Sequence, residues 1–290
     1  MPLRFPSSRR RSSRRSPAGG LLGNGRLIIG LIMAAVAIGS YLLNTDVNPV
    51  TGKKQRVAGI TPEQEIALGL EAAPEMAQQH GGLSRDRRGR ERVKDIGEEL
   101  LYALQMSLRE RDRSVPYRFD FHLLADPSLV NAFALPGGQV FITEALYSKL
   151  NDAQLAGVIG HEIGHVLERH GAERIALQQR NAGLSRAVGV AAGDMRMAQM
   201  AQMAVQVSSM AHGRDQELEC DLWAVELMDA AEYNPAAMIE VMQILKEASG
   251  GAGGQPEFLS THPHPESRIE ALQKILRERY PDGVPATYRS

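Results

Sequence analysis

Cysteine is nearly absent from this sequence of 290 residues, which contains only Cys220. A disulfide within the chain is therefore excluded. A lipid anchor on a cysteine at the end of an N-terminal signal is excluded as well, because Cys220 lies far from the N-terminus. Internal repeats of fixed length are also absent. With 43% hydrophobic and 23% charged residues, the composition is that of a globular chain that forms one large domain or two small ones.

Acidic residues are absent from the first 45 positions, which contain seven arginines. The rest of the chain carries 26 basic and 34 acidic residues, a formal charge of −8. A body with this negative charge has no obvious basic surface for nucleic acid, so nucleic acid is not an expected partner. We interpret residues 1–26 as a basic tail. The alternative, a disordered arm that binds nucleic acid, is disfavoured because an apolar segment follows the arginines directly.

Charge of either sign is absent from residues 27–43. As a helix this run would be about 25 Å long, just enough to cross a bilayer. The preceding arginines predict a cytoplasmic N-terminus, because positive charge is retained on the inner side. We therefore expect a single-pass signal-anchor in the inner (cell) membrane, with a periplasmic or otherwise extracytoplasmic body. The alternative is a cleaved signal peptide, but its A-x-A match, Ala35 to Ala37, lies inside the apolar run rather than after it.

Residues 44–60 are interpreted as a linker because they contain a proline and two glycines. This leaves residues 61–290 as the main domain. Its first helix is predicted to begin after Thr61, which forms a capping box with Gln64. The helix should end by Gly81, and a second helix should follow it.

Two short strands are expected before a long helical region. Alternation of apolar residues from Tyr117 to Leu123 predicts the first strand, and residues 139–142 predict the second. The segment from Asp152 to Arg279 is predicted to be almost wholly helical. Five methionines between Met195 and Met210 are interpreted as adaptable core or groove packing, with a mobile lid as the alternative. The expected fold class is α+β, mainly helical, with a small sheet.

His161, Glu162 and His165 form the motif H-E-x-x-H on an apolar helix that Asn151 can cap and Gly171 can end. The histidines are four residues apart and share one face, where two neutral imidazoles can bind one zinc ion. Glu162 lies one residue further round, so its carboxylate can bond a water on the metal. The alternative is a pair of core histidines without a metal, and the carboxylate between them argues against it.

A catalytic zinc ion needs a third protein ligand and one open position. Residue 171, where a metzincin would have its third histidine, is a glycine. Glu168 follows on the same helix, but ligands at i, i+4 and i+7 form a row about 10 Å long and do not converge. The third ligand must therefore come from another segment. Glu217 and Asp221 share a face of a further predicted helix, so Glu217 can bind the metal while Asp221 orients a histidine. Glu219 lies on another face and is expected to be solvated.

Four motifs, in this order along the chain, resemble those of zinc metallopeptidase family forty-eight. They are the stretch Asn131 to Gly138, His161-Glu162-x-x-His165, Glu217-x-x-x-Asp221, and Thr261-His262-Pro263 with Arg268 six residues after His262. The resemblance covers residues 61–279. It implies a gluzincin-like (zincin) fold with a small mixed sheet beside the zinc helix. It also implies one zinc ion per chain and Glu217 as the third ligand.

The resemblance further implies that His262 and Arg268 face the site and stabilise the transition state. In the BepA-like branch of the family, His262 is instead implied to be a regulatory fourth ligand. Prolines on both sides of His264 disfavour helix, so His262 is expected on a stiff loop, with His264 at the surface. Glycines within residues 250–254 would let this loop move. Two roles therefore stay open for His262, a latch on the metal and a donor to the oxyanion.

The sequence thus predicts a membrane-anchored zinc endopeptidase. One apolar span, in place of several, fits the BepA-like branch better than the Ste24 and HtpX branches. An extended protein or peptide substrate is expected to add a strand to an exposed sheet edge, with an ordinary hairpin as the alternative. The residues expected at this edge are Asn131, Ala132, Phe133 and Ala134. Misfolded or unassembled envelope proteins are implied as substrates by the resemblance. Two rival functions are a chaperone-like binding protein with a latched zinc site and an exopeptidase.

Overall fold

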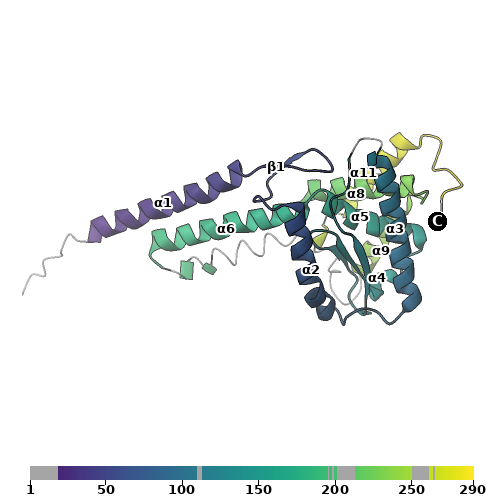
Figure 1. Cartoon of the computed structure of the whole chain (residues 1–290), viewed down its shortest axis with the longest axis horizontal. Helices are drawn as coiled ribbons and strands as arrows, with labels where there is room; N and C mark the ends of the chain where they lie inside the picture. The colour runs from purple at the N-terminus through teal and green to yellow at the C-terminus, as the bar shows by residue number, and fades with distance from the viewer. Residues whose placement is uncertain are drawn as a thin grey trace, which may run out of the picture.

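A computed structural model describes residues 19–109, 113–194, 196–197, 199–200, 213–249, 261–263 and 265–290. The chain forms a body of helices and a small sheet, from which two helices, α1 (Gly19–Leu43) and α6 (His170–Ala192), project side by side (Figure 1). Three of the five methionines, His264 and residues 250–254 lie outside the described residues. The other two, Met197 and Met200, are exposed.

Helix α1 contains the predicted apolar run. Within the described part of the chain, its segment Gly25–Leu43 is the one stretch long and apolar enough to cross a membrane, with a mean hydropathy of 2.1. Small residues line the packing contact between α1 and α6. A Cβ atom added to Gly30 would lie 2.8 Å from Ala187 O, and one added to Gly183 would lie 2.8 Å from Ala37 Cβ. Because later residues of α1 meet earlier residues of α6, the two helices are antiparallel.

Residues 44–60 contain a two-stranded antiparallel ladder of β1 (Asp46–Val47) and β2 (Lys54–Gln55). The buried Asn48 side chain donates a hydrogen bond of 2.8 Å to Leu167 O, at the end of the helix that carries H-E-x-x-H. The segment predicted to be a linker is therefore docked on the body.

The first helix of the body begins as predicted. Thr61 Oγ1 accepts a hydrogen bond from Gln64 N, and Gln64 Oε1 accepts one from Thr61 N, which confirms the capping box before α2 (Pro62–Gln79). Helix α3 (Arg87–Arg109) follows and turns one apolar face to the core. The buried residues of that face include Val93, Ile96, Leu100 and Leu104.

The sheet consists of β3 (Asp120–Leu124), β4 (Ala132–Ala134) and β5 (Gln139–Thr143) in the order β3-β5-β4. Strands β3 and β5 are parallel, whereas β4 and β5 are antiparallel, so the predicted mixed sheet is confirmed. The first strand begins at Asp120 and not at Tyr117, which is buried outside the strand. In the described residues no further strand pairs with β4, which places β4 at the sheet edge.

The remaining helices surround a central one. Helix α5 (Asp152–Leu167) is buried along nearly its whole length and packs against α8 (Arg214–Ala230) and α9 (Ala237–Ser249). The short α4 (Glu144–Tyr147) precedes it, and α11 (Pro265–Arg279) packs on α8 and α9. The expected mainly helical α+β fold is confirmed.

The predicted end of the central helix at Gly171 is wrong. Helix α5 ends at Leu167, and Arg169 then adopts a left-handed conformation with φ of 57°, which costs energy in a residue other than glycine. Its guanidinium compensates with ion pairs of 2.7 Å to Glu65 and 3.1 Å to Asp46. The chain therefore bends at Arg169 and continues as α6 through Gly171.

Candidate metal centre

The close approach of α5 and α8 brings the polar side chains of both helices together. A Cβ atom added to Gly160 would lie 3.1 Å from Ala224 Cα, and one added to Gly164 would lie 3.0 Å from Cys220 Cα. These two glycines, about one turn apart on α5, let the backbone of α8 lie against α5. Glu217 in the first turn of α8 therefore reaches the H-E-x-x-H face.

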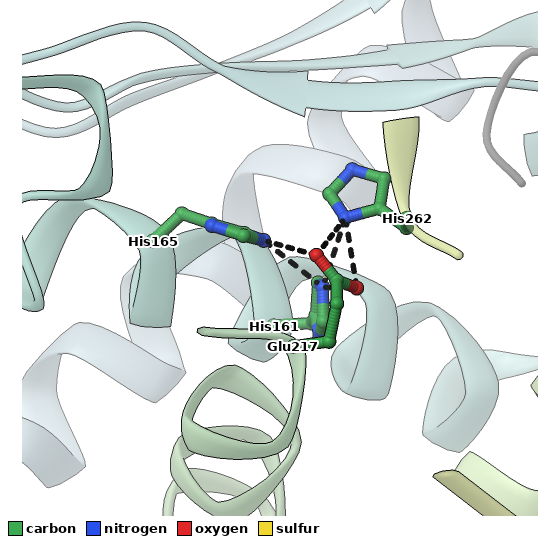
Figure 2. Close-up of side chains that lie close together, drawn as sticks. All are labelled: His161, His165, Glu217 and His262. Carbon is green, nitrogen blue, oxygen red and sulfur yellow. Dashed lines mark hydrogen bonds and ion pairs between the residues drawn. The ribbon is translucent and has the colours of Figure 1, made fainter. Parts of the chain in front are cut away.

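Four potential metal ligands converge at this contact (Figure 2). Nε2 of His161 and Nε2 of His165 are 3.2 Å apart. The Glu217 carboxylate oxygens lie 3.5 Å from the first of these nitrogens and 3.6 Å from the second. Nδ1 of His262 lies 3.1 Å from Glu217 Oε1 and 3.3 Å from His161 Nε2. All four side chains are buried.

The spacing of these donor atoms fits a tetrahedral zinc ion. Bonds of about 2.0–2.2 Å at tetrahedral angles place ligand atoms about 3.3–3.6 Å apart, close to the separations of the four donors. The donor set of imidazole nitrogens and one carboxylate is also one that zinc accepts. These side chains could therefore hold one zinc ion, with His161, His165 and Glu217 as the three expected ligands and His262 as a fourth possible donor.

Behind the ligands, Asp221 and Arg268 form a buried network. His161 Nδ1 lies 3.0 Å from Asp221 Oδ1. The Arg268 guanidinium donates to both Asp221 oxygens, at 2.6 and 2.8 Å, and also lies 2.8 Å from Glu217 Oε2. Arg268 does not line the cleft in front of the ligands. Its charge thus fixes two carboxylates that would otherwise repel each other.

These charges act on the titrating groups of the centre. Burial and Arg268 oppose a charge on His161, but hydrogen bonds to Asp221 and Glu217 outweigh them and raise the pKa of His161 to about 9. Burial also opposes ionisation of Glu217, yet His262 and His161 hold its pKa below the ordinary value. Burial raises the pKa of the Glu162 carboxyl. The positive charges of His161 and Arg268 therefore balance the carboxylates of Glu217 and Asp221 before any cation binds.

His165 has a different set of neighbours, which the sequence did not indicate. Its Nδ1 lies 3.0 Å from His170 Nδ1, and His170 Nε2 lies 3.4 Å from Glu219 Oε2. Glu219 is half exposed, in line with the expectation that it is solvated, but it is also paired with Lys53 at 2.8 Å. On a continuous helix a residue at i+5 would lie about 140° round from His165, so only the bend at Arg169 brings His170 to it.

Glu162, the expected general base, lines the same cleft as His165 and His262. Its side chain is buried, and Oε1 has no hydrogen-bond partner in the described part of the chain. The nearest charged neighbour is His262, whose Nε2 is 3.6 Å from Oε1. A buried carboxylate oxygen without a partner is costly to the fold, which is typical of an atom that binds a ligand or water.

Glu162, His165 and His262 line a cleft of about 380 Å³. Its walls come from α2, the start of α6 and the β4 edge. Three of the four residues expected to bind substrate, Asn131, Phe133 and Ala134, line the cleft, whereas Ala132 is fully buried and does not. Alternation turns Ala132 away from the face of Asn131 and Phe133, whereas Ala134 reaches the cleft at the last position of β4.

The sequence model of Peptidase family M48 matches residues 88–276, a range that contains every residue of the centre and the β4 edge. The beta-barrel assembly-enhancing protease of Escherichia coli (strain K12) is 33% identical over 193 residues, which are 63% of this chain and 39% of that protein. The mitochondrial metalloendopeptidase OMA1 of Schizosaccharomyces pombe is 31% identical over 164 residues, or 56% of this chain and 48% of that protein. The chain thus spans less than half the length of these two relatives.

Proposed function

Because the chain belongs to peptidase family M48, we propose that it is a membrane-anchored zinc endopeptidase. Its substrates would be misfolded or unassembled proteins of the cell envelope. The observation that carries this proposal is the convergence of His161, His165 and Glu217 next to a buried Glu162, whose Oε1 makes no hydrogen bond within the described residues, in an open cleft. Among the relatives, one is named a protease that enhances β-barrel assembly and another a mitochondrial metalloendopeptidase, which supports peptide-bond hydrolysis.

Each side chain of the centre has its own proposed role in the reaction. His161, His165 and Glu217 would hold one zinc ion, which polarises a peptide carbonyl and makes water more acidic. Glu162 is placed to take a proton from the attacking water and to return it to the leaving amine. Asp221 accepts a hydrogen bond from His161 Nδ1, which orients Nε2 toward the proposed metal position. Arg268 holds Asp221 and Glu217 in place.

The substrate is proposed to bind along β4. This strand lies at the sheet edge and at the cleft, so an extended peptide could pair with its free backbone groups. Pairing through the backbone reads few side chains, which suits an enzyme that acts on many unfolded sequences. Asn131 at the start of the edge is held by Thr143, whose Oγ1 accepts from Asn131 N at 3.1 Å.

Cleavage of a denatured protein such as casein tests this function. The purified full chain is expected to produce internal fragments, chelator treatment should abolish them, and added zinc should restore them. Binding of casein without cleavage would favour the chaperone-like alternative. Release of single amino acids would favour the exopeptidase.

We propose that α1 anchors the enzyme with its N-terminus in the cytoplasm. Large apolar side chains of α1 are exposed, among them Leu31 at 70% and Leu43 at 83%, as expected of a surface that faces lipid. The E. coli relative is named for β-barrel assembly, which fits a body on the far side of the inner membrane. If the anchor is retained, detergent should release the protein from membranes, whereas an alkaline wash should not.

His262 is proposed to act as a latch. Its Nδ1 lies within 3.3 Å of donor atoms of both Glu217 and His161, so it occupies the position that a water would need. Replacing it should open the site, and His262→Ala is expected to raise basal casein cleavage about tenfold if the open state is about a tenth of the population. Initial rates at equal zinc content provide the measurement. A loss of about a hundredfold would show instead that His262 stabilises the oxyanion.

A further inference from the structure

Arg174, in α6, lines the cleft, and no ion pair of its guanidinium is found among the described residues. It lines the same cleft as Glu162 and His262, and its Nη2 atom is buried without a hydrogen-bond partner in the described residues. Two arginines near the centre that are fully buried differ from Arg174, whose side chain is only partly buried. Arg169 pairs with Glu65 at 2.7 Å, and Arg268 donates to Asp221 at 2.6 and 2.8 Å.

A guanidinium nitrogen that is shielded from water and makes no hydrogen bond is unfavourable for the fold. Transfer of a charge from water to a buried position is costly unless an opposite charge compensates for it. Burial lowers the pKa of Arg174, with only Glu217 acting in the opposite direction. The apolar side chains of Val166 and Ile175, which also line the cleft, offer no acceptor.

Each acidic residue that lines the cleft already has a basic neighbour. Glu65 is bonded to Arg169, and Glu162 faces His262. Among the described residues that line the cleft, no third carboxylate is present. The charge that balances Arg174 can therefore be supplied by a ligand that enters the cleft.

We propose that Arg174 forms an anion subsite that binds a carboxylate of the peptide substrate near the scissile bond. The carboxylate belongs either to an aspartate or glutamate side chain or to a free C-terminus. This inference rests on the proposed peptidase function and adds a preference for negative charge to backbone pairing along β4. A guanidinium–carboxylate pair in a partly desolvated site should change kcat/KM by about 10-fold to 100-fold.

Paired peptides test the subsite. A set with glutamate, glutamine or lysine at each of the three positions on either side of the cleaved bond is compared with C-terminal acid and amide forms. We expect glutamate to be preferred at one position, Arg174→Gln to abolish this preference, and Arg174→Glu to replace it with a preference for lysine. A preference of the acid over the amide that depends on Arg174 would identify the C-terminal carboxylate as the source.

The matched control is Arg180→Gln, on the same helix but not at this cleft. It should leave the peptide preferences unchanged. If Arg174→Gln slows glutamate, glutamine and lysine peptides equally, Arg174 contacts the main chain, and the proposal is wrong. It is also wrong if the wild-type protein shows no charge preference at any position.

Two further measurements separate this proposal from the peptidase function. Binding of labelled glutamate and lysine peptides to Glu162→Gln protein reports the subsite even if no cleavage occurs. Thermal unfolding of Arg174→Met should be unchanged or shifted to higher temperature, because an uncompensated charge is removed. A fall in the unfolding temperature as large as that of Arg169→Met would show that Arg174 is a structural residue.

Discussion

Glu162→Gln protein is expected to fold and to retain its metal, yet to cleave casein about 10²-fold to 10⁴-fold more slowly than the wild-type protein. The amide has nearly the shape of the carboxylate but cannot accept a proton from water. Glu162 is not one of the four grouped donors, so zinc content should be unaffected. Its unpartnered Oε1 also makes no hydrogen bond within the described residues that the fold would lose.

Initial rates of casein cleavage and zinc content by elemental analysis measure this effect together. The two results are needed together because loss of activity with loss of zinc would reflect only a damaged site. Near-normal turnover by Glu162→Gln would remove Glu162 from the mechanism. The cleft would then need another base, and His262, 3.6 Å from Glu162, would be the first to test.

Glu217→Ala should have the second large effect, loss of the metal. The substitution removes one of three proposed ligands, and it also leaves Arg268 with one carboxylate where it now has two. Removing one partner of a buried ion pair typically costs about 3–5 kcal/mol, so a lower unfolding temperature is expected as well. Zinc retained after gel filtration and the thermal unfolding midpoint provide the measurements.

Glu219→Ala is the matched control from the same helix. Glu219 contacts His170 and Lys53 but is not among the four clustered donors. A residue that acts through a histidine usually changes metal affinity by about 10-fold to 100-fold, much less than a ligand. Equal zinc content in Glu217→Ala and Glu219→Ala proteins would mean that Glu217 is not the third ligand.

Much of the site could be predicted because its parts are local. The chelate of His161 and His165 follows from helical spacing alone, and so does the shared face of Glu217 and Asp221. The capping box at Thr61 likewise depends on only four consecutive residues. Such features need no knowledge of the rest of the fold.

Other features depend on contacts between distant segments and could not be predicted. Arg169 takes its left-handed conformation because Glu65 and Asp46, more than a hundred positions earlier, pair with it. Only this bend brings His170 to His165 and allows α6 to continue past Gly171. The unpaired state of Arg174 likewise depends on which distant residues line the cleft.

The contact between α1 and α6 also determines how the body would behave without its N-terminal helix. In a chain shortened to start after α1, the face of α6 that contacts α1 would be exposed. This face consists of small residues, among them Gly183, Ala187 and Ala191. An uncovered stripe of this kind favours self-association. Oligomers of such a shortened protein in a sizing experiment would then reflect the missing helix and not the native assembly. Including α1, in detergent or lipid, avoids this artefact of protein production.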